Sequence, residues 1–180
     1  MMKIIDNFLT PSYHRQIEKH LLSPQCPWYY HQNITNVDDK TSSLHDFGFG
    51  SNITTDGKKW INTFFLPFAY QIQDQLPMQT TIGRMRLDMT LYNPDGVVHH
   101  PHVDSEEPHF ASIYYVNDSD GDTILYNETE LSKEYTSQAR IEPKANRLLI
   151  FNGKYYHTGS SPSHHKNRII INSNFMCQCE

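Results

Sequence analysis

Alternation of apolar and polar residues dominates the second half of the chain, from about residue 79 onward. Six segments carry this period of two, namely residues 80–92, 96–104, 110–117, 122–127, 147–152 and 168–175. Turn-forming runs such as N-P-D-G and N-D-S-D-G-D separate them. Because a strand alternates its side chains between two faces, and short strands at close spacing build sandwiches or barrels, the pattern predicts an all-β body of about six to eight strands.

The first 78 residues have a different pattern, which predicts helices and short strands. The run K-I-I-D-N-F-L near the start predicts a short opening strand. Thr10 followed by Pro11 is typical of a helix start, and the sequence predicts a helix from Pro11 to about Leu22. We therefore expect helices to precede the β body.

A second helix is predicted between about Lys58 and Leu76, where apolar residues recur at helical spacing. Pro67 should kink this helix or split it in two, because proline lacks the N–H that the helical ladder needs. The aromatic, Gly-punctuated segment 26–52 predicts short strands joined by an irregular loop through residues 38–43. Since such loops often cover binding sites, we expect this one to be a mobile cover.

Length and charge are those of a globular protein with one domain. A chain of 180 residues can bury most of its surface around a single core. We expect one domain over residues 1–180, in which residues 1–78 support a β core over residues 79–176. The net charge of −5, with no run of Lys or Arg, gives no reason to expect a nucleic-acid partner.

The lack of a recognisable secretory signal and the odd number of cysteines favour an intracellular protein. The sequence has no apolar stretch of membrane-spanning length, and its first ten residues lack the apolar core of a secretory signal. Three cysteines form an odd set, and Cys177 and Cys179 stand too close together to bridge comfortably. We therefore expect reduced thiols, a cytoplasmic location and no membrane partner.

His102 and Asp104 are the first candidate metal ligands. If residues 97–104 enter a strand, the period of two places both side chains on the same face, where an imidazole and a carboxylate can converge on one ion. A third ligand must come from another strand, and His157, which follows the apolar strand R-L-L-I-F, is the natural candidate. Two imidazoles and one carboxylate favour Fe(II) oxygenase chemistry, although Zn, Co, Ni or Mn can occupy the same ligands.

Polar strand faces predict a cavity beside this metal site. Arg168 opens the last strand and is suited to grip a carboxylate by two hydrogen bonds, which suggests a dicarboxylate co-substrate. Polar residues on one face of a buried strand are costly unless they line a cavity. The candidates for the substrate side of this cavity are Arg86, Asp88, Asn172 and Asn174.

Each candidate also has an ordinary structural interpretation. An H-x-D triplet arises by chance on the order of once in a chain with this many histidines. Arg168 alone would most often be a salt-bridge partner, the pair Arg84 and Arg86 ordinary strand surface, and Tyr115 a core aromatic. The joint order and spacing of these residues favour a site. The nearby His99, His100 and His109 are weaker ligand candidates.

These residues together resemble the Fe(II) and 2-oxoglutarate-dependent dioxygenases, and most closely their prolyl hydroxylase branch. The resemblance rests on H-V-D at 102–104, on His157 and Arg168, on Tyr92 ten residues before His102, and on the runs I-Y-Y-V-N and I-E-P-K-A-N-R-L-L-I-F. It covers roughly residues 85–176. Asn172 and Asn174 depart from it, because the animal oxygen-sensing members have Thr and Trp there.

The resemblance implies a fold and a ligand set. The fold would be mainly β with N-terminal helices, a cupin-like double-stranded β-helix, or jelly roll, packed against two or three helices. Fe(II) would be held by His102, Asp104 and His157. The co-substrate 2-oxoglutarate would chelate the iron and extend its far carboxylate to Arg168 and the hydroxyl of Tyr115, with Tyr92 lining the same pocket.

The implied activity is hydroxylation of an unactivated C–H bond with O2, which releases succinate and CO2, with ascorbate as a helper cofactor. The branch suggests a prolyl residue of a peptide or protein as substrate. A free amino acid or small metabolite is the alternative. A nucleic-acid demethylase is less favoured because of the acidic charge balance, and an inactive jelly-roll binding protein is least favoured because all the ligands are present.

Overall fold

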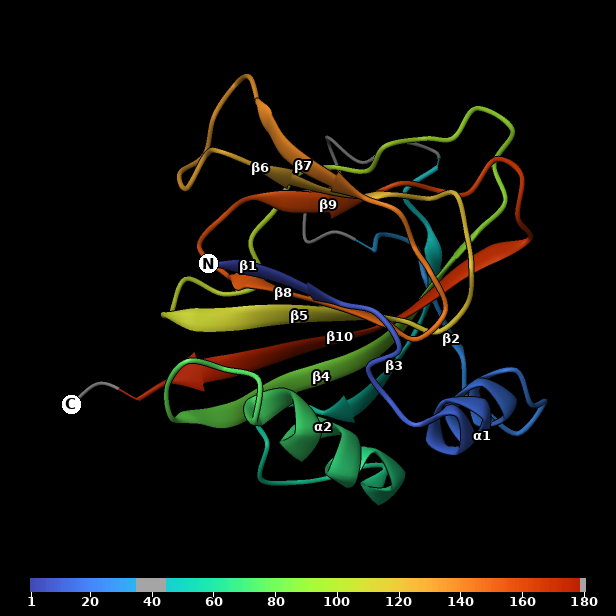
Figure 1. Ribbon diagram of the computed structural model, residues 1–180. Helices are drawn as coiled ribbons and strands as arrows, with labels where there is room; N and C mark the ends of the chain where they lie inside the picture. The colour runs from blue at the N-terminus through green and yellow to red at the C-terminus, as the bar shows by residue number, and fades with distance from the viewer. Residues whose placement is uncertain (35–44, 179–180) are drawn as a thin grey trace.

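The computed structural model describes residues 1–34 and 45–178, which form two antiparallel sheets and a small helical layer (Figure 1). The large sheet has the strand order β1-β8-β5-β10-β4-β3-β2, and the small sheet has the order β7-β6-β9. The strands are β1 (Met2–Ile5), β2 (Tyr29–His31), β3 (Gly48–Thr54), β4 (Thr80–Leu91), β5 (His109–Tyr115), β6 (Thr123–Tyr126), β7 (Ser137–Ile141), β8 (Arg147–Asn152), β9 (His157–Gly159) and β10 (Asn167–Cys177). The predicted loop through residues 38–43 lies outside the described residues.

The mainly β jelly-roll fold with N-terminal helices is confirmed. The long strands β4 and β10 pair in the middle of the large sheet, and β10 also pairs with β5. The strand predicted for residues 96–104 is wrong, because this segment forms only isolated bridges, Val98 with Ser160 and His102 with His157. Pro101 explains part of the interruption, since it has no N–H to donate to a ladder.

The first helix is confirmed and the second is shorter than predicted. Helix α1 (Pro11–Leu21) begins after Thr10, with proline in its first turn. In place of one helix from Lys58, a 3-10 turn η1 (Thr63–Phe65) leads into helix α2 (Leu66–Gln73). Pro67 lies in the first turn of α2, where its missing N–H costs nothing, so it opens the helix and does not kink it.

Two apolar clusters cover the two faces of the large sheet. The cluster on one face joins helix residues such as Ile17 and Phe68 to sheet residues such as Leu87 and Ile171. The other face packs against the small sheet, with Ile113 and Leu125 in its cluster. Figure 1 shows the same layers, with the helices below the large sheet and β6, β7 and β9 above it. The polar residues of β4 and β10 enter the space between the two sheets.

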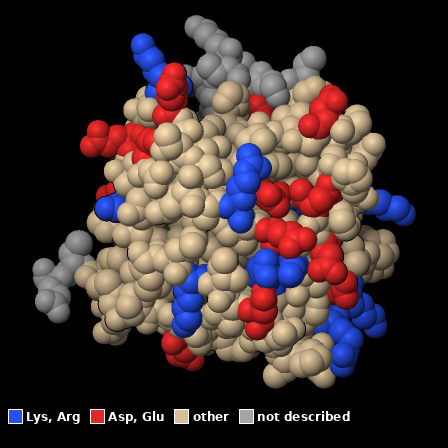
Figure 2. All heavy atoms as spheres, turned by 45° about the horizontal axis from the view of Figure 1, so that its top comes forward, with Lys and Arg blue, Asp and Glu red and all other residues tan. Residues whose placement is uncertain are grey.

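The surface carries both signs of charge. On the face drawn in Figure 2, which turns the small-sheet side toward the viewer, Lys and Arg side chains are interspersed with Asp and Glu. A mixed surface of this kind gives no strong attraction to a polyanion. Among the described helices, none is long and apolar enough to cross a membrane.

Candidate metal centre and co-substrate pocket

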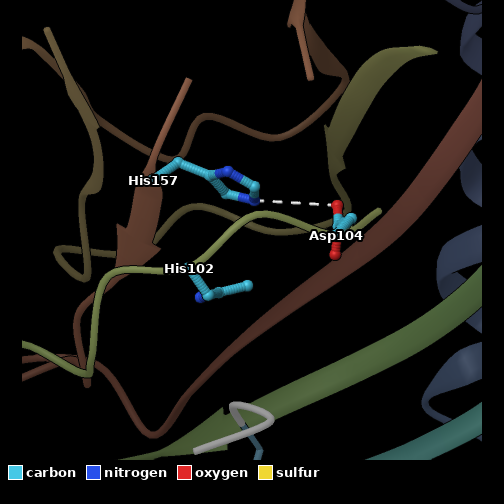
Figure 3. Close-up of side chains that lie close together, drawn as sticks. All are labelled: His102, Asp104 and His157. Atoms are coloured by element: carbon cyan, nitrogen blue, oxygen red, sulfur yellow. Dashed lines mark ion pairs between the residues drawn. The ribbon is translucent and has the colours of Figure 1, made fainter. Parts of the chain in front are cut away.

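His102, Asp104 and His157 converge between the two sheets (Figure 3). Each offers one ligand atom, and these atoms all lie within 4.8 Å of one another. The two histidine backbones pair directly, because the N–H of each donates to the carbonyl of the other at 3.0 and 2.9 Å. The backbone thus holds the imidazoles side by side, and Nε2 of His157 lies 3.7 Å from Oδ2 of Asp104.

Both imidazoles are oriented as metal ligands. Nδ1 of His102 donates to the carbonyl of His100 at 3.1 Å, and Nδ1 of His157 donates to the carbonyl of Tyr155 at 3.2 Å. Since a carbonyl only accepts, each Nδ1 carries a hydrogen, which leaves Nε2 as the ring nitrogen that can bind a metal. Burial, together with the nearby His102, lowers the pKa of His157 to about 4, so the ring is neutral at pH 7.

Asp104 is a buried carboxylate with several donors around it. Its side chain is 3% exposed, and Nη2 of Arg84 lies 2.6 Å from Oδ1. Nδ2 of Asn172 donates to both oxygens at 3.3 Å. Burial alone would raise the pKa of Asp104, but the neighbouring His157, Arg84 and His102 outweigh it and hold the pKa below its usual value. The group therefore stays an anion, as a metal ligand must.

A cavity that is open to solvent lies beside the two histidines. His102, His157 and Arg168 all line it, as do Arg86, Asp88 and Asn172. The structure therefore brings together one wall of metal ligands and one wall of charged and polar strand residues, as the polar strand faces predict.

Arg168 is a buried cation that has room for an anionic partner. It is 5% exposed, its Nη2 donates to Oγ1 of Thr123 at 2.7 Å, and its Nε has no hydrogen-bond partner among the described residues. Burial lowers the pKa of Arg168, which means that the charge is held in an unfavourable medium. A carboxylate entering the cavity would relieve this cost by charge-assisted hydrogen bonds.

The two tyrosines of the site lie differently. The hydroxyl of Tyr115 bonds Oγ1 of Thr123 at 2.7 Å, and its ring lies 5.8 Å from the guanidinium carbon of Arg168, so Thr123 joins the two residues. Tyr92 is 54% exposed and does not line the cavity. It follows the last residue of β4, where the chain turns away into the N-P-D-G segment.

Of the four substrate-side candidates, three line the cavity and Asn174 does not. Nε of Arg86 lies 2.7 Å from Oδ1 of Asp88, and both side chains line the cavity. Asn172 lines the cavity and bonds Asp104. Asn174, with its amide nitrogen turned toward Asp104, donates to Oδ2 at 3.1 Å and lines a separate groove.

Three further residues lie around the site: Thr123, which the sequence did not indicate, Arg84, which was interpreted as strand surface, and His99, which was a weaker ligand candidate. Arg84 and Thr123 form tertiary contacts that no local pattern reveals. His99 lines the cavity and is held between Asp46, at 3.0 Å, and the hydroxyl of Ser161, at 3.1 Å. His100 turns toward Asp46, with Nε2 at 3.6 Å, so neither of these two histidines joins the triad.

Comparison with solved structures agrees with this fold. Over 97% of its length the chain is similar to a prolyl hydroxylase from Trichoplax adhaerens, solved with a peptide fragment of hypoxia inducible factor (TM-score 0.68, 17% identity, 83% of that chain). Over 98% it is similar to a prolyl-4-hydroxylase from Pseudomonas putida (TM-score 0.61, 14% identity, 92% of that chain). Over 97% it is similar to the epimerase SnoN from nogalamycin biosynthesis (TM-score 0.68, 10% identity, 77% of that chain). These likenesses show the fold.

Sequence comparison gives the family. No curated protein matches the chain. The family model described as the 2OG-Fe(II) oxygenase superfamily matches residues 87–176, which is half of the 180 residues. The match includes His102, Asp104, His157 and Arg168. The family implies Fe(II), 2-oxoglutarate and O2. The two imidazoles, the anionic carboxylate of Asp104 and the buried Arg168 suit such a metal and such a dicarboxylate. The chain therefore belongs to the 2OG-Fe(II) oxygenase superfamily.

Proposed function

We propose that this chain, acting as one catalytic domain, hydroxylates a prolyl residue in a peptide or protein. The reaction would consume O2 and 2-oxoglutarate and release succinate and CO2. The observation that carries the proposal is the single cavity that is lined both by two histidines of the triad and by the buried Arg168. This arrangement provides separate positions for a metal and for a carboxylate.

Each residue of the cavity would have a distinct task. His102, Asp104 and His157 would hold Fe(II), which supplies the redox chemistry that couples O2 to oxidation of the co-substrate and of the substrate. Arg168 would bind the far carboxylate of 2-oxoglutarate, and the hydroxyl of Tyr115 would turn from Thr123 to assist it. The apolar residues Ile113 and Ile170 in the lining would exclude water.

Prolyl peptides are proposed as substrate because of two supports. The sequence around the triad and the run 141–151 resemble the prolyl hydroxylase branch. Two of the structural neighbours carry prolyl hydroxylase in their names, one of them with a bound peptide. We also propose a cytoplasmic location and ascorbate as the reductant that keeps the iron ferrous.

A free amino acid or small metabolite is the second candidate, and the Arg86–Asp88 pair favours it. Both groups line the same cavity as the histidines, and Nε of Arg86 lies 2.7 Å from Oδ1 of Asp88. The remaining nitrogens and the second carboxylate oxygen suit a ligand that carries both an anion and an ammonium group, as free amino acids do.

Product analysis separates these substrates. Purified protein with Fe(II), 2-oxoglutarate and ascorbate is incubated with a proline-rich peptide library or with free amino acids, and mass spectrometry detects the addition of one oxygen atom. We expect hydroxylated prolyl peptides together with succinate. His102→Ala and Asp104→Ala should abolish both products. Hydroxylation of free proline without any hydroxylated peptide would reject the peptide substrate, and substrate-dependent succinate from the alanine variants would reject the metal triad.

A further inference from the structure

Arg84 makes the shortest polar contact to the carboxylate of Asp104. Its Nη2 lies 2.6 Å from Oδ1, while the amide nitrogens of Asn172 and Asn174 lie 3.3 and 3.1 Å from the carboxylate oxygens. The side chain of Arg84 is 26% exposed and that of Asp104 is 3% exposed. The guanidinium therefore reaches inward from the rim of a groove to a buried group.

The two oxygens of Asp104 have different surroundings. Oδ2 lies 3.7 Å from Nε2 of His157, along the dashed line of Figure 3, whereas the other oxygen points away from His157. That other oxygen, Oδ1, receives Arg84. One oxygen is thus directed at the remaining metal ligands, and the other is held by a cation.

A β-bulge lies at Arg84. In the pairing of β4 with β10, Met85 is opposite Ser173 and Ile82 is opposite Phe175. Gly83 and Arg84 therefore both stand opposite Asn174, so that β4 carries one extra residue. Bulges of this kind change the direction of side chains and are frequent next to active sites. A Cβ on Gly83 would lie only 3.0 Å from the carbonyl oxygen of Asn174, so glycine allows this close pairing.

We propose that Arg84 is a positioning residue of the metal centre. Its guanidinium holds Oδ1 of Asp104 and leaves Oδ2 facing His157, on the side where the triad would hold the metal. Arg84 also compensates the buried negative charge before the metal arrives. Asn172 and Asn174, the two departures from the oxygen-sensing relatives, complete the set of donors around the carboxylate. The inference rests on the proposed metal triad.

Metal binding without substrate tests this role. Co(II) is titrated into the metal-free protein, and both its dissociation constant and its visible absorption, which reports coordination number, are measured. Loss of a residue that orients a metal ligand typically weakens metal affinity about 10–100-fold. We expect Arg84→Gln to weaken Co(II) binding by about tenfold or more and to alter the spectrum. Arg84→Lys, which keeps the charge but not the planar fork, should fall between Arg84→Gln and the wild type.

Arg147→Gln is the matched control. Arg147 contacts Asp6 with the same 2.6 Å distance, in a pair that includes no residue of the metal centre. This variant should keep the wild-type Co(II) affinity and spectrum. Wild-type affinity and spectrum in Arg84→Gln, or in Arg84→Lys if the glutamine variant does not fold, would overturn the role of Arg84. If Asp104→Ala also binds Co(II) like the wild type, the triad itself is rejected, which separates the two failures.

Discussion

At the scale of single residues, the site is a set of buried charges that the chain arranges in advance. Asp104 has its donors and Arg168 has Thr123, but Nε of Arg168 lacks a hydrogen-bond partner among the described residues. An uncompensated buried charge is unfavourable, and a ligand of opposite charge removes the penalty. Burial of Arg168 therefore costs free energy. Binding of a dicarboxylate would remove part of this cost.

The sequence could supply the candidates for the metal triad and for Arg168, because their order and spacing are local properties of the chain. It could not supply the role of Arg84, because the contact with Asp104 is a tertiary one that no local pattern reveals. Thr123 was missed for a similar reason, since its link to Tyr115 and Arg168 joins three different strands. The resemblance implied that Tyr92 lines the pocket, but β4 ends one residue before it and Tyr92 does not line the cavity.

Arg168→Ala tests the proposed carboxylate site. The variant loses charge-assisted hydrogen bonds worth about 1.5–3 kcal/mol, so the concentration of 2-oxoglutarate needed for half-maximal turnover should rise about 10–100-fold. Affinity for Co(II) should change little, because Arg168 is not a metal ligand. Steady-state kinetics and metal titration measure the two quantities. Arg140→Ala, which removes an exposed arginine on β7, is the control. An unchanged requirement for 2-oxoglutarate in Arg168→Ala would contradict the carboxylate site.

At the scale of elements, the side chain of Asn146 links the start of α1 to the sheet. Asn146 accepts hydrogen bonds from the backbone N–H of Leu9 at 2.8 Å and the hydroxyl of Tyr114 at 3.1 Å, and it donates to the carbonyl of Leu9 at 2.8 Å. Its φ of 63° lies in the left-handed region, which asparagine tolerates better than most residues. The residue therefore fixes the start of α1 against β5.

Element boundaries were the least predictable part of the fold. Helical spacing of apolar residues from Trp60 onward suggested one helix, yet Trp60 forms an isolated bridge with Thr54 and Pro67 begins α2. The same apolar side chains can cover a sheet from a strand, a turn or a helix, so burial alone does not fix the conformation. Pro67 was expected to interrupt a helix, but it lies in the first turn of α2.

Asn146→Ala should destabilise the protein far more than Asn7→Ala. Both residues have positive φ, 63° and 54°, so each substitution carries a similar backbone strain. Only Asn146 loses three buried hydrogen bonds, which are worth about 0.5–1.5 kcal/mol each. We expect the free energy of unfolding to fall by about 2–4 kcal/mol more in Asn146→Ala than in Asn7→Ala. Urea denaturation measures the difference, and equal losses would mean that the hydrogen bonds of Asn146 contribute nothing.

At the scale of the whole molecule, the large sheet separates a structural layer from a chemical one. The helices pack on one face of the sheet through the cluster that contains Phe68, and the metal ligands lie between the other face and the small sheet. The all-β body was predictable because alternation extends over many residues. The folding of β6, β7 and β9 over the large sheet was expected only through the family resemblance, since alternation does not specify which strands pair.

This separation predicts that stability and metal binding can be altered independently. Phe68 is fully buried against Tyr114, with ring centroids 5.2 Å apart, so Phe68→Ala should lower the free energy of unfolding by about 3–5 kcal/mol. Its Co(II) affinity should stay at the wild-type value under conditions in which the protein is folded.

Phe151 lies on the other face, with its ring centroid 4.9 Å from that of His157. Phe151→Leu keeps most of the apolar volume but removes this support, and it should weaken Co(II) binding. Denaturation curves and metal titrations of both variants provide the comparison. Equal effects of the two substitutions on metal affinity would show that the sheet transmits changes from the helical layer to the metal centre.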